Sequence, residues 1–222
     1  FFYIISVRYL SMKNIFLFAC FFTCFFTSFG GNIHSTVDTS YRDFDISEHA
    51  LYEKGSTTLF SGKINEVYSN GNLRMVGKAV DGKFEGTIVM FYNNGVKKSE
   101  GLFQHGDKTG HWLLWYNNRQ LKSEGNYENG FRSGKWLVYY KTGQKFQERS
   151  FVNGFNDETY ISWYSDGVTS EEGQYFEGMI TGHWKSFYED GKPRSHILYD
   201  QYGNVEIYEM WLEDGTKVEY GY

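Results

Sequence analysis

Proline and cysteine are scarce in this chain of 222 residues, which has one proline and two cysteines, Cys20 and Cys24. The single proline, beside 25 glycines interleaved with aromatic residues, excludes a low-complexity linker. Both cysteines lie in an apolar N-terminal run, so we expect a processed chain to contain neither disulfides nor thiolate metal sites. Such a domain must be held by its core, and 20% aromatic residues can supply one.

A strong excess of positive charge is also missing. The formal net charge is −5, and lysine and arginine are spread among the acidic residues without forming a block. This distribution argues against bare nucleic acid or a strongly anionic membrane surface as the partner.

Catalytic signatures are absent too: there is no His-Glu-x-x-His, no phosphate-binding glycine loop before a helix and no glycine-flanked nucleophilic serine. His111 and His183 occupy the same position of a repeat but stand three repeats apart, on the order of 29 Å in a sheet, so they cannot share a metal. We therefore expect a protein that is not an enzyme, with no metal and no cofactor.

The N-terminal residues have the pattern of a secretory leader. One basic residue after Met12 precedes an apolar run that ends at Phe29, which predicts a signal peptide over residues 12–30 with cleavage after Gly30. Residues 1–11 are interpreted as upstream translation and residues 31–55 as a polar segment that caps the domain. We expect export to the periplasm, the outer envelope or the medium; an uncleaved membrane anchor and a lipoprotein acylated at Cys20 remain alternatives.

From Ser56 to the C-terminus the sequence repeats with a period of 24 residues. One column is glycine in every unit except at Arg119, and a second holds tyrosines from Tyr68 to Tyr188. The glycines, whose simplest role is turn geometry, are Gly71, Gly95, Gly143, Gly167, Gly191 and Gly215. The fourth unit is degenerate, with Arg149 and Glu158 in positions that are glycine in most other units.

Each unit contains two turn signals, exemplified by Asn94-Gly95 and Asn129-Gly130. We predict that both are two-residue hairpin turns with positive φ angles. The segments between the turns alternate, so that Leu121, Gly125 and Tyr127 are expected on one face of their strand. The predicted fold is all-β: an elongated antiparallel meander of tandem 24-residue hairpins with about 12–14 strands, over residues 56–222.

Two aromatic stripes are expected on opposite faces of this sheet. The first includes Trp112, Trp136, Tyr160 and Trp184, and we expect it to be structural. The second is the candidate binding stripe, formed by Phe91, Trp115, Tyr139, Trp163 and Phe187. An exposed stripe can stack on sugar rings or anchor a protein; coverage by long side chains from neighbouring strands is the favoured alternative.

An acidic column also recurs in the strands, at Glu100, Glu124, Glu148 and Glu172. Paired carboxylates can hydrolyse glycosides when they lie roughly 5–9.5 Å apart. These residues are instead expected on the solvated face of their strands, where a charged stripe serves solubility.

The unit from Gly125 to Tyr140 resembles a MORN-type repeat in the variant form common in bacterial proteins. Proteins similar to this one are often labelled YwqK-type antitoxin components, and eukaryotic MORN proteins act as membrane-associated or complex-assembling scaffolds. The repeat architecture, the predicted leader and the missing catalytic motifs together predict an exported, non-catalytic scaffold that binds a protein in the cell envelope. A carbohydrate or cell-wall binding module and an immunity protein that neutralises a toxin are the alternatives.

Overall fold

A computed structural model describes residues 44–47, by their backbone alone, and residues 50–219. In these ranges it contains strands and turns and no helix. The strands are β1 (Phe44–Ser47), β2 (Ala50–Glu53), β3 (Gly62–Val67), β4 (Leu73–Val80), β5 (Lys83–Phe84), β6 (Gly86–Phe91), β7 (Lys97–Gln104), β8 (Asp107–Trp115), β9 (Leu121–Glu128), β10 (Phe131–Tyr139), β11 (Lys145–Val152), β12 (Phe155–Trp163), β13 (Thr169–Phe176), β14 (Met179–Phe187), β15 (Pro193–Tyr199) and β16 (Val205–Met210).

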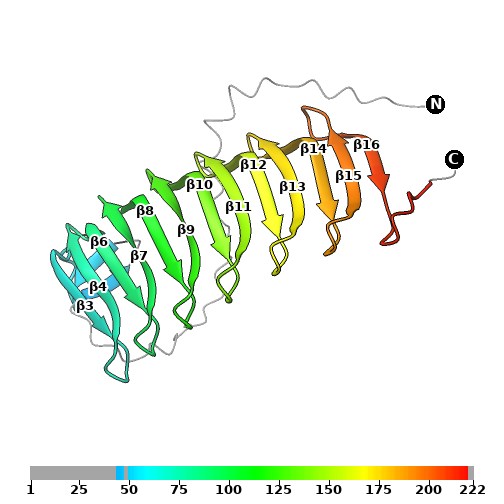
Figure 1. Cartoon of the computed structure of the whole chain (residues 1–222). Helices are drawn as coiled ribbons and strands as arrows, with labels where there is room; N and C mark the ends of the chain where they lie inside the picture. The colour runs from blue at the N-terminus through cyan, green and yellow to red at the C-terminus, as the bar shows by residue number, and fades with distance from the viewer. Residues whose placement is uncertain (1–43, 48–49, 220–222) are drawn as a thin grey trace, which may run out of the picture. The chain divides into compact units, whose positions relative to one another are not determined.

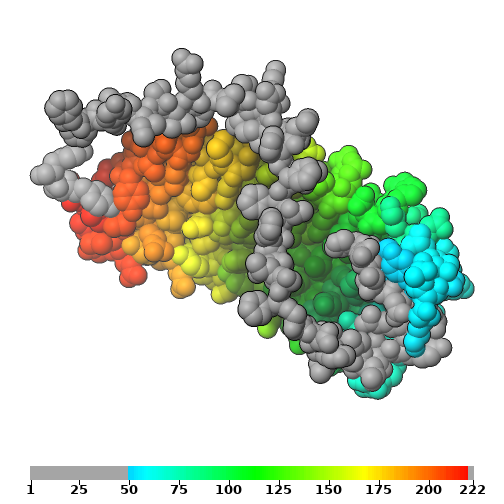
Figure 2. Space-filling view, turned by 180° about the vertical axis from the view of Figure 1, so that it is seen from behind, coloured from blue at the N-terminus to red at the C-terminus, as the bar shows by residue number. Residues whose placement is uncertain are grey.

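The repeats form one antiparallel sheet of 14 strands in which neighbours in sequence are neighbours in space. The order runs from β3 to β16 without a crossover, and the short β5 pairs with β4 off this path. Figure 1 shows these strands side by side in chain order, and Figure 2 shows the successive repeats as adjoining bands of colour. The predicted all-β meander of tandem hairpins is confirmed.

The two turns of each repeat belong to different types, which corrects the prediction of a common two-residue turn. Asn129 and Gly130 both have positive φ, 49° and 83°, as a two-residue turn with the right-handed twist of a hairpin requires. At the other edge Gly95 alone has positive φ, and Tyr92 donates its N–H to the carbonyl of Val96. That turn is a longer loop closed by a left-handed residue, and Arg119 takes the same conformation with φ 73°.

The tyrosine column joins each repeat to the next. Each hydroxyl donates to the backbone carbonyl 23 residues further along, over 2.7–2.9 Å. Tyr116, for example, donates to the carbonyl of Tyr139. Since a net hydrogen bond contributes about 1 kcal/mol, the column adds a regular stabilising interaction between neighbouring hairpins. The tyrosine donors are Tyr68, Tyr92, Tyr116, Tyr140, Tyr164 and Tyr188.

The core lies on one face of the sheet, which we call the buried face and define by Trp112, Trp136 and Tyr160. Trp112 and Trp136 are each only 3% exposed. Each indole lies over a glycine of the preceding strand: a Cβ on Gly101 would come within 2.2 Å of Trp112, and one on Gly125 within 2.3 Å of Trp136. The absent side chains at these glycines thus create the space that the rings occupy.

Aromatic rings from alternate strands continue this core along the buried face. Phe103 packs edge-to-face on Trp112, and Tyr127 packs in the same way on both Trp112 and Trp136, with ring centroids 5.1–5.6 Å apart. Such edge-to-face geometry is favourable beyond the area that it buries. The Arg132 guanidinium lies over the Trp136 ring at 4.6 Å and covers its outer side.

The N-terminal end of the sheet is covered by the hairpin of β1 and β2. Leu51 is buried, and its N–H donates to the carbonyl of Gly82 while its carbonyl accepts from Phe60. Leu51 and Phe60 belong to the same apolar cluster as Ile64. The hairpin therefore shields the first repeat, in the C-terminal part of the segment that we predicted as a cap.

The fourth repeat departs from the pattern at the expected residues. Arg149 replaces the glycine under the ring, and its guanidinium lies 5.2 Å from the centroid of Tyr160, which replaces tryptophan. The Nε atom of Arg149 is buried without a hydrogen-bond partner in the described part of the chain. Glu158 adopts φ 58°, close to the 62° of Gly134 in the preceding unit. This repeat keeps its pairing but is strained.

Candidate functional site

The face opposite the core carries the candidate binding stripe, and we call it the open face. Five residues that we singled out, Phe91, Trp115, Tyr139, Trp163 and Phe187, line up on alternate strands of this face together with Trp211. All of them are half-buried. Lysine ammonium groups lie 5.1–5.7 Å from the ring centroids of Trp115, Trp163 and Trp211 and account for part of this coverage.

Leu121 lies on a different face from the one that simple alternation predicts. It pairs directly with Trp115 on the open face, whereas Gly125 remains on the buried face. The reason is a register shift between Leu114 and Trp115, because an extra residue changes the side to which the following side chains point. The same shift recurs in the other repeats and places one residue between successive aromatic rings of the stripe.

The acidic column runs along the middle of the open face, where it alternates with aliphatic residues. Glu124, for example, pairs across the strands with both Leu113 and Leu137. The expectation of a solvated stripe holds at the two ends, where the side chains of Glu100 and Glu172 are 35% and 41% exposed, but not at Glu148, which is only 14% exposed and binds Lys135 at 2.5 Å. Each of the four carboxylates has a cationic or histidine partner.

Glu124 connects this acidic column to the aromatic stripe. Its carboxylate accepts a hydrogen bond of 2.6 Å from the Tyr139 hydroxyl and lies 3.5 Å from Nε2 of His111. Burial, followed by this hydrogen bond and the charge of Glu124, raises the pKa of Tyr139 to about 12. The Tyr139 hydroxyl is therefore a neutral donor with a fixed acceptor.

A patch of exposed apolar side chains, which our sequence analysis missed, lies at the two-residue-turn edge of β10 to β14. We call it the edge patch. Phe131 and Phe155 are 60% and 64% exposed, and Val152 pairs with Phe155 as Phe176 pairs with Met179. The 24-residue period contained the information needed to find this patch. At the repeat position of Phe131 the earlier units have Lys83 and Asp107, whereas the later units have the apolar residues Phe155 and Met179.

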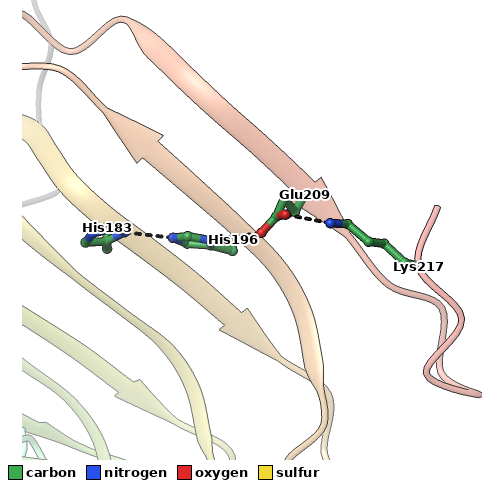
Figure 3. Close-up of polar contacts among 4 residues, drawn as sticks. All are labelled: His183, His196, Glu209 and Lys217. Carbon is green, nitrogen blue, oxygen red and sulfur yellow. Dashed lines mark hydrogen bonds and ion pairs between the residues drawn. The ribbon is translucent and has the colours of Figure 1, made fainter. Parts of the chain in front are cut away.

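A row of four polar side chains crosses the open face at the C-terminal end of the sheet (Figure 3). Lys217 donates to Glu209 over 2.6 Å, and Nδ1 of His196 lies 3.2 Å from the second oxygen of that carboxylate. Nε2 of His196 lies 2.8 Å from Nδ1 of His183. The planes of the two imidazoles differ by 23°, and their ring centroids lie 5.0 Å apart.

The described residues contain no group of three or more histidine, cysteine, aspartate or glutamate side chains arranged to hold a metal. The polar partner of the His183 side chain is His196, and that of His111 is Glu124.

The predicted signal peptide and the alternative lipidation at Cys20 lie outside the described residues. Those residues include no helix with the length and apolar character needed to cross a membrane.

Comparison with known proteins identifies the repeat. The MORN repeat variant matches residues 84–105, 108–129, 132–153 and 180–201, and the gap between the third and fourth matches contains the degenerate unit with Glu158. No curated protein matches the chain significantly. The four matches fall on the hairpins β6–β7, β8–β9, β10–β11 and β14–β15 of a single meander, so the repeats of this chain belong to the MORN repeat variant family.

Proposed function

We propose that this chain is a non-catalytic repeat scaffold that binds a protein partner of the cell envelope through its open face. The observation that carries this proposal is the edge patch, because soluble surfaces seldom expose several large apolar side chains side by side unless these bind something. Assignment to the envelope rests on the secretory pattern of residues 12–30.

The architecture favours binding over catalysis. An open sheet of tandem hairpins offers a long surface on which contacts repeat, and repeat arrays use such surfaces for recognition. The open face combines exposed aromatic side chains with half-buried charged pairs, which is the composition of a protein-binding surface. The buried face cannot serve in the same way, since Trp112 and Trp136 are packed over glycines.

The test compares the two apolar features of the open face in the full chain. Phe155→Ala with Phe176→Ala removes two exposed rings of the edge patch, and Trp115→Ala with Trp163→Ala opens the stripe. Tyr202→Ala is the matched control, because Tyr202 is equally exposed but lies in the turn between β15 and β16. Each variant is immobilised and exposed to envelope extract, after its fold has been verified by circular dichroism.

We expect a protein that is retained by the wild type and by the Tyr202 variant and is lost from the Phe155 and Phe176 variant. Hydrogen exchange on the isolated complex should then show protection in β10 to β14. Equal retention by all the variants, or turnover of a substrate by the purified chain, would contradict the proposal.

Carbohydrate binding is the second candidate, favoured by the half-exposed rings of Trp115, Tyr139 and Trp163 in one row. Retention on insoluble cell-wall polysaccharide that is lost in the Trp115 and Trp163 variant would support it. Passage of the wild type through the same matrix would exclude it.

A further inference from the structure

The stripe of the open face is a row of aromatic ridges that are separated by single residues. The intervening residue is Lys97, Leu121 or Lys145 in the first three intervals. In the next two intervals it is Thr169, after Trp163, and Pro193, after Phe187. Those two side chains are short and uncharged, and we call the two intervals between Trp163, Phe187 and Trp211 the notches.

The second notch is visible as a hollow in the surface. Phe187, Pro193 and Trp211 line a depression of about 210 Å³, together with Lys185 and His196. The surface of this hollow is almost wholly apolar. In the intervals that hold Lys97 and Lys145, the lysine lies against the neighbouring Trp115 or Trp163 ring.

The spacing of the notches matches one kind of peptide. Successive ridges stand on alternate strands, which places them about 9.6 Å apart, at two strand spacings of about 4.8 Å. A polyproline II helix advances about 3.1 Å per residue with three residues per turn, or about 9.3 Å per turn. A segment that crosses the strands can therefore place the prolines of a Pro-x-x-Pro motif in successive notches.

The hydrogen-bonding groups of the stripe fit the same ligand. On the buried face, the indole N–H groups of Trp112 and Trp136 donate to backbone carbonyls. Within the described ranges, no hydrogen bond links the indole N–H of Trp163 or Trp211 to a protein acceptor. A polyproline II segment carries carbonyl groups without internal partners, and two of its turns span about the distance from Trp163 to Trp211.

We infer that the C-terminal part of the stripe, from Trp163 to Trp211, is a docking site for a proline-rich protein segment in the polyproline II conformation. Grooves lined by aromatic side chains recognise such segments in other proteins. This inference rests on the proposed function and names the chemistry of the partner on the same face. It requires neither a conformational change nor a catalytic group.

The probe is a capped oligoproline of about nine residues, three turns of the helix, and a glycine-serine peptide of equal length is the control ligand. Binding to the full chain is followed by the ¹⁵N-labelled indole resonances. Pro193→Lys and Thr169→Lys each place a lysine in one of the two notches. Lys97 and Lys145 already occupy the corresponding positions of other intervals. Leu121→Lys introduces the same side chain outside the two notches and is the matched control.

We expect the indole resonances of Trp163 and Trp211 to shift and those of Trp112 and Trp136 to stay. Affinity should fall at least about tenfold with lysine in either notch, and by less than about twofold in the Leu121 variant. No indole shift, equal binding of the glycine-serine peptide, or undiminished binding by both notch variants would overturn the inference. If oligoproline binding fails but capture of an envelope protein still depends on Phe155 and Phe176, the proposed function stands and only the inference about the ligand is refuted. If both oligoproline binding and this capture fail, the proposed function and the inference are refuted together.

Discussion

Gly125→Ala tests whether the missing side chain under Trp136 holds the buried face together. The new Cβ would come within 2.3 Å of Cδ2 of the indole, whereas carbon atoms pack at about 3.5–4.0 Å, so the ring or the strand must move by more than about 1 Å. Overpacking of this kind costs about 1–3 kcal/mol. Losing the indole hydrogen bond to Asn126 adds about 0.5–1.5 kcal/mol. We therefore expect a total loss of about 1.5–4.5 kcal/mol.

The assay is a double-mutant cycle with Trp136→Ala, which alone should cost about 3–5 kcal/mol. Without the ring, Gly125→Ala should change the stability by less than about 0.5 kcal/mol, giving a coupling of about 1 kcal/mol or more. Gly167→Ala is the control: its Cβ meets no atom within 4 Å, so it carries only the strain of φ +93°, about 1–2 kcal/mol in either background.

Urea unfolding gives the free energies of this cycle, and native-state hydrogen exchange in β9 and β10 locates the loss, because repeat arrays open locally. Additive costs of Gly125→Ala and Trp136→Ala would refute the packing argument. A loss below about 1 kcal/mol in the single Gly125 variant would refute it as well.

Three further predictions concern stability and ionisation. Tyr116→Phe removes the hydrogen bond to the next repeat and should cost about 1 kcal/mol in urea unfolding, whereas Tyr202→Phe should cost nothing measurable. The pKa of Tyr139 is raised from 10.0 to about 12, so its contribution to stability is complete below pH 10 and is lost as the pH rises towards 12. In Glu124→Gln, which removes the charge beside the hydroxyl, the tyrosinate absorbance of Tyr139 should appear at lower pH. An unchanged titration would show that Glu124 does not contribute to the raised pKa. Glu158→Gly relieves a residue held at φ 58° and should raise stability by about 1 kcal/mol, which an unchanged or lower urea midpoint would exclude.

The repeat and its architecture follow from the sequence because both depend on local chemistry. Asn-Gly pairs at a fixed spacing require hairpin turns, and alternation along each strand separates Trp112 from Trp115. The degenerate unit was also recognisable, since Arg149 replaces the glycine under the ring and Glu158 replaces a glycine that adopts positive φ inside the strand. In an antiparallel meander every strand pairs with its sequence neighbour, so local signals determine the topology.

The composition of the open face, in contrast, was decided by the tertiary structure. The register shift beside Trp115 moves Leu121 across the sheet, and no residue type in that strand announces it. Contact between His183 and His196 depends on the register of β14 and β15. The exposure of Phe155 depends on how far the neighbouring side chains cover it. The period of the sequence thus determined which residues form columns, while the bulges and the strand register determined which columns meet and which remain open to a partner.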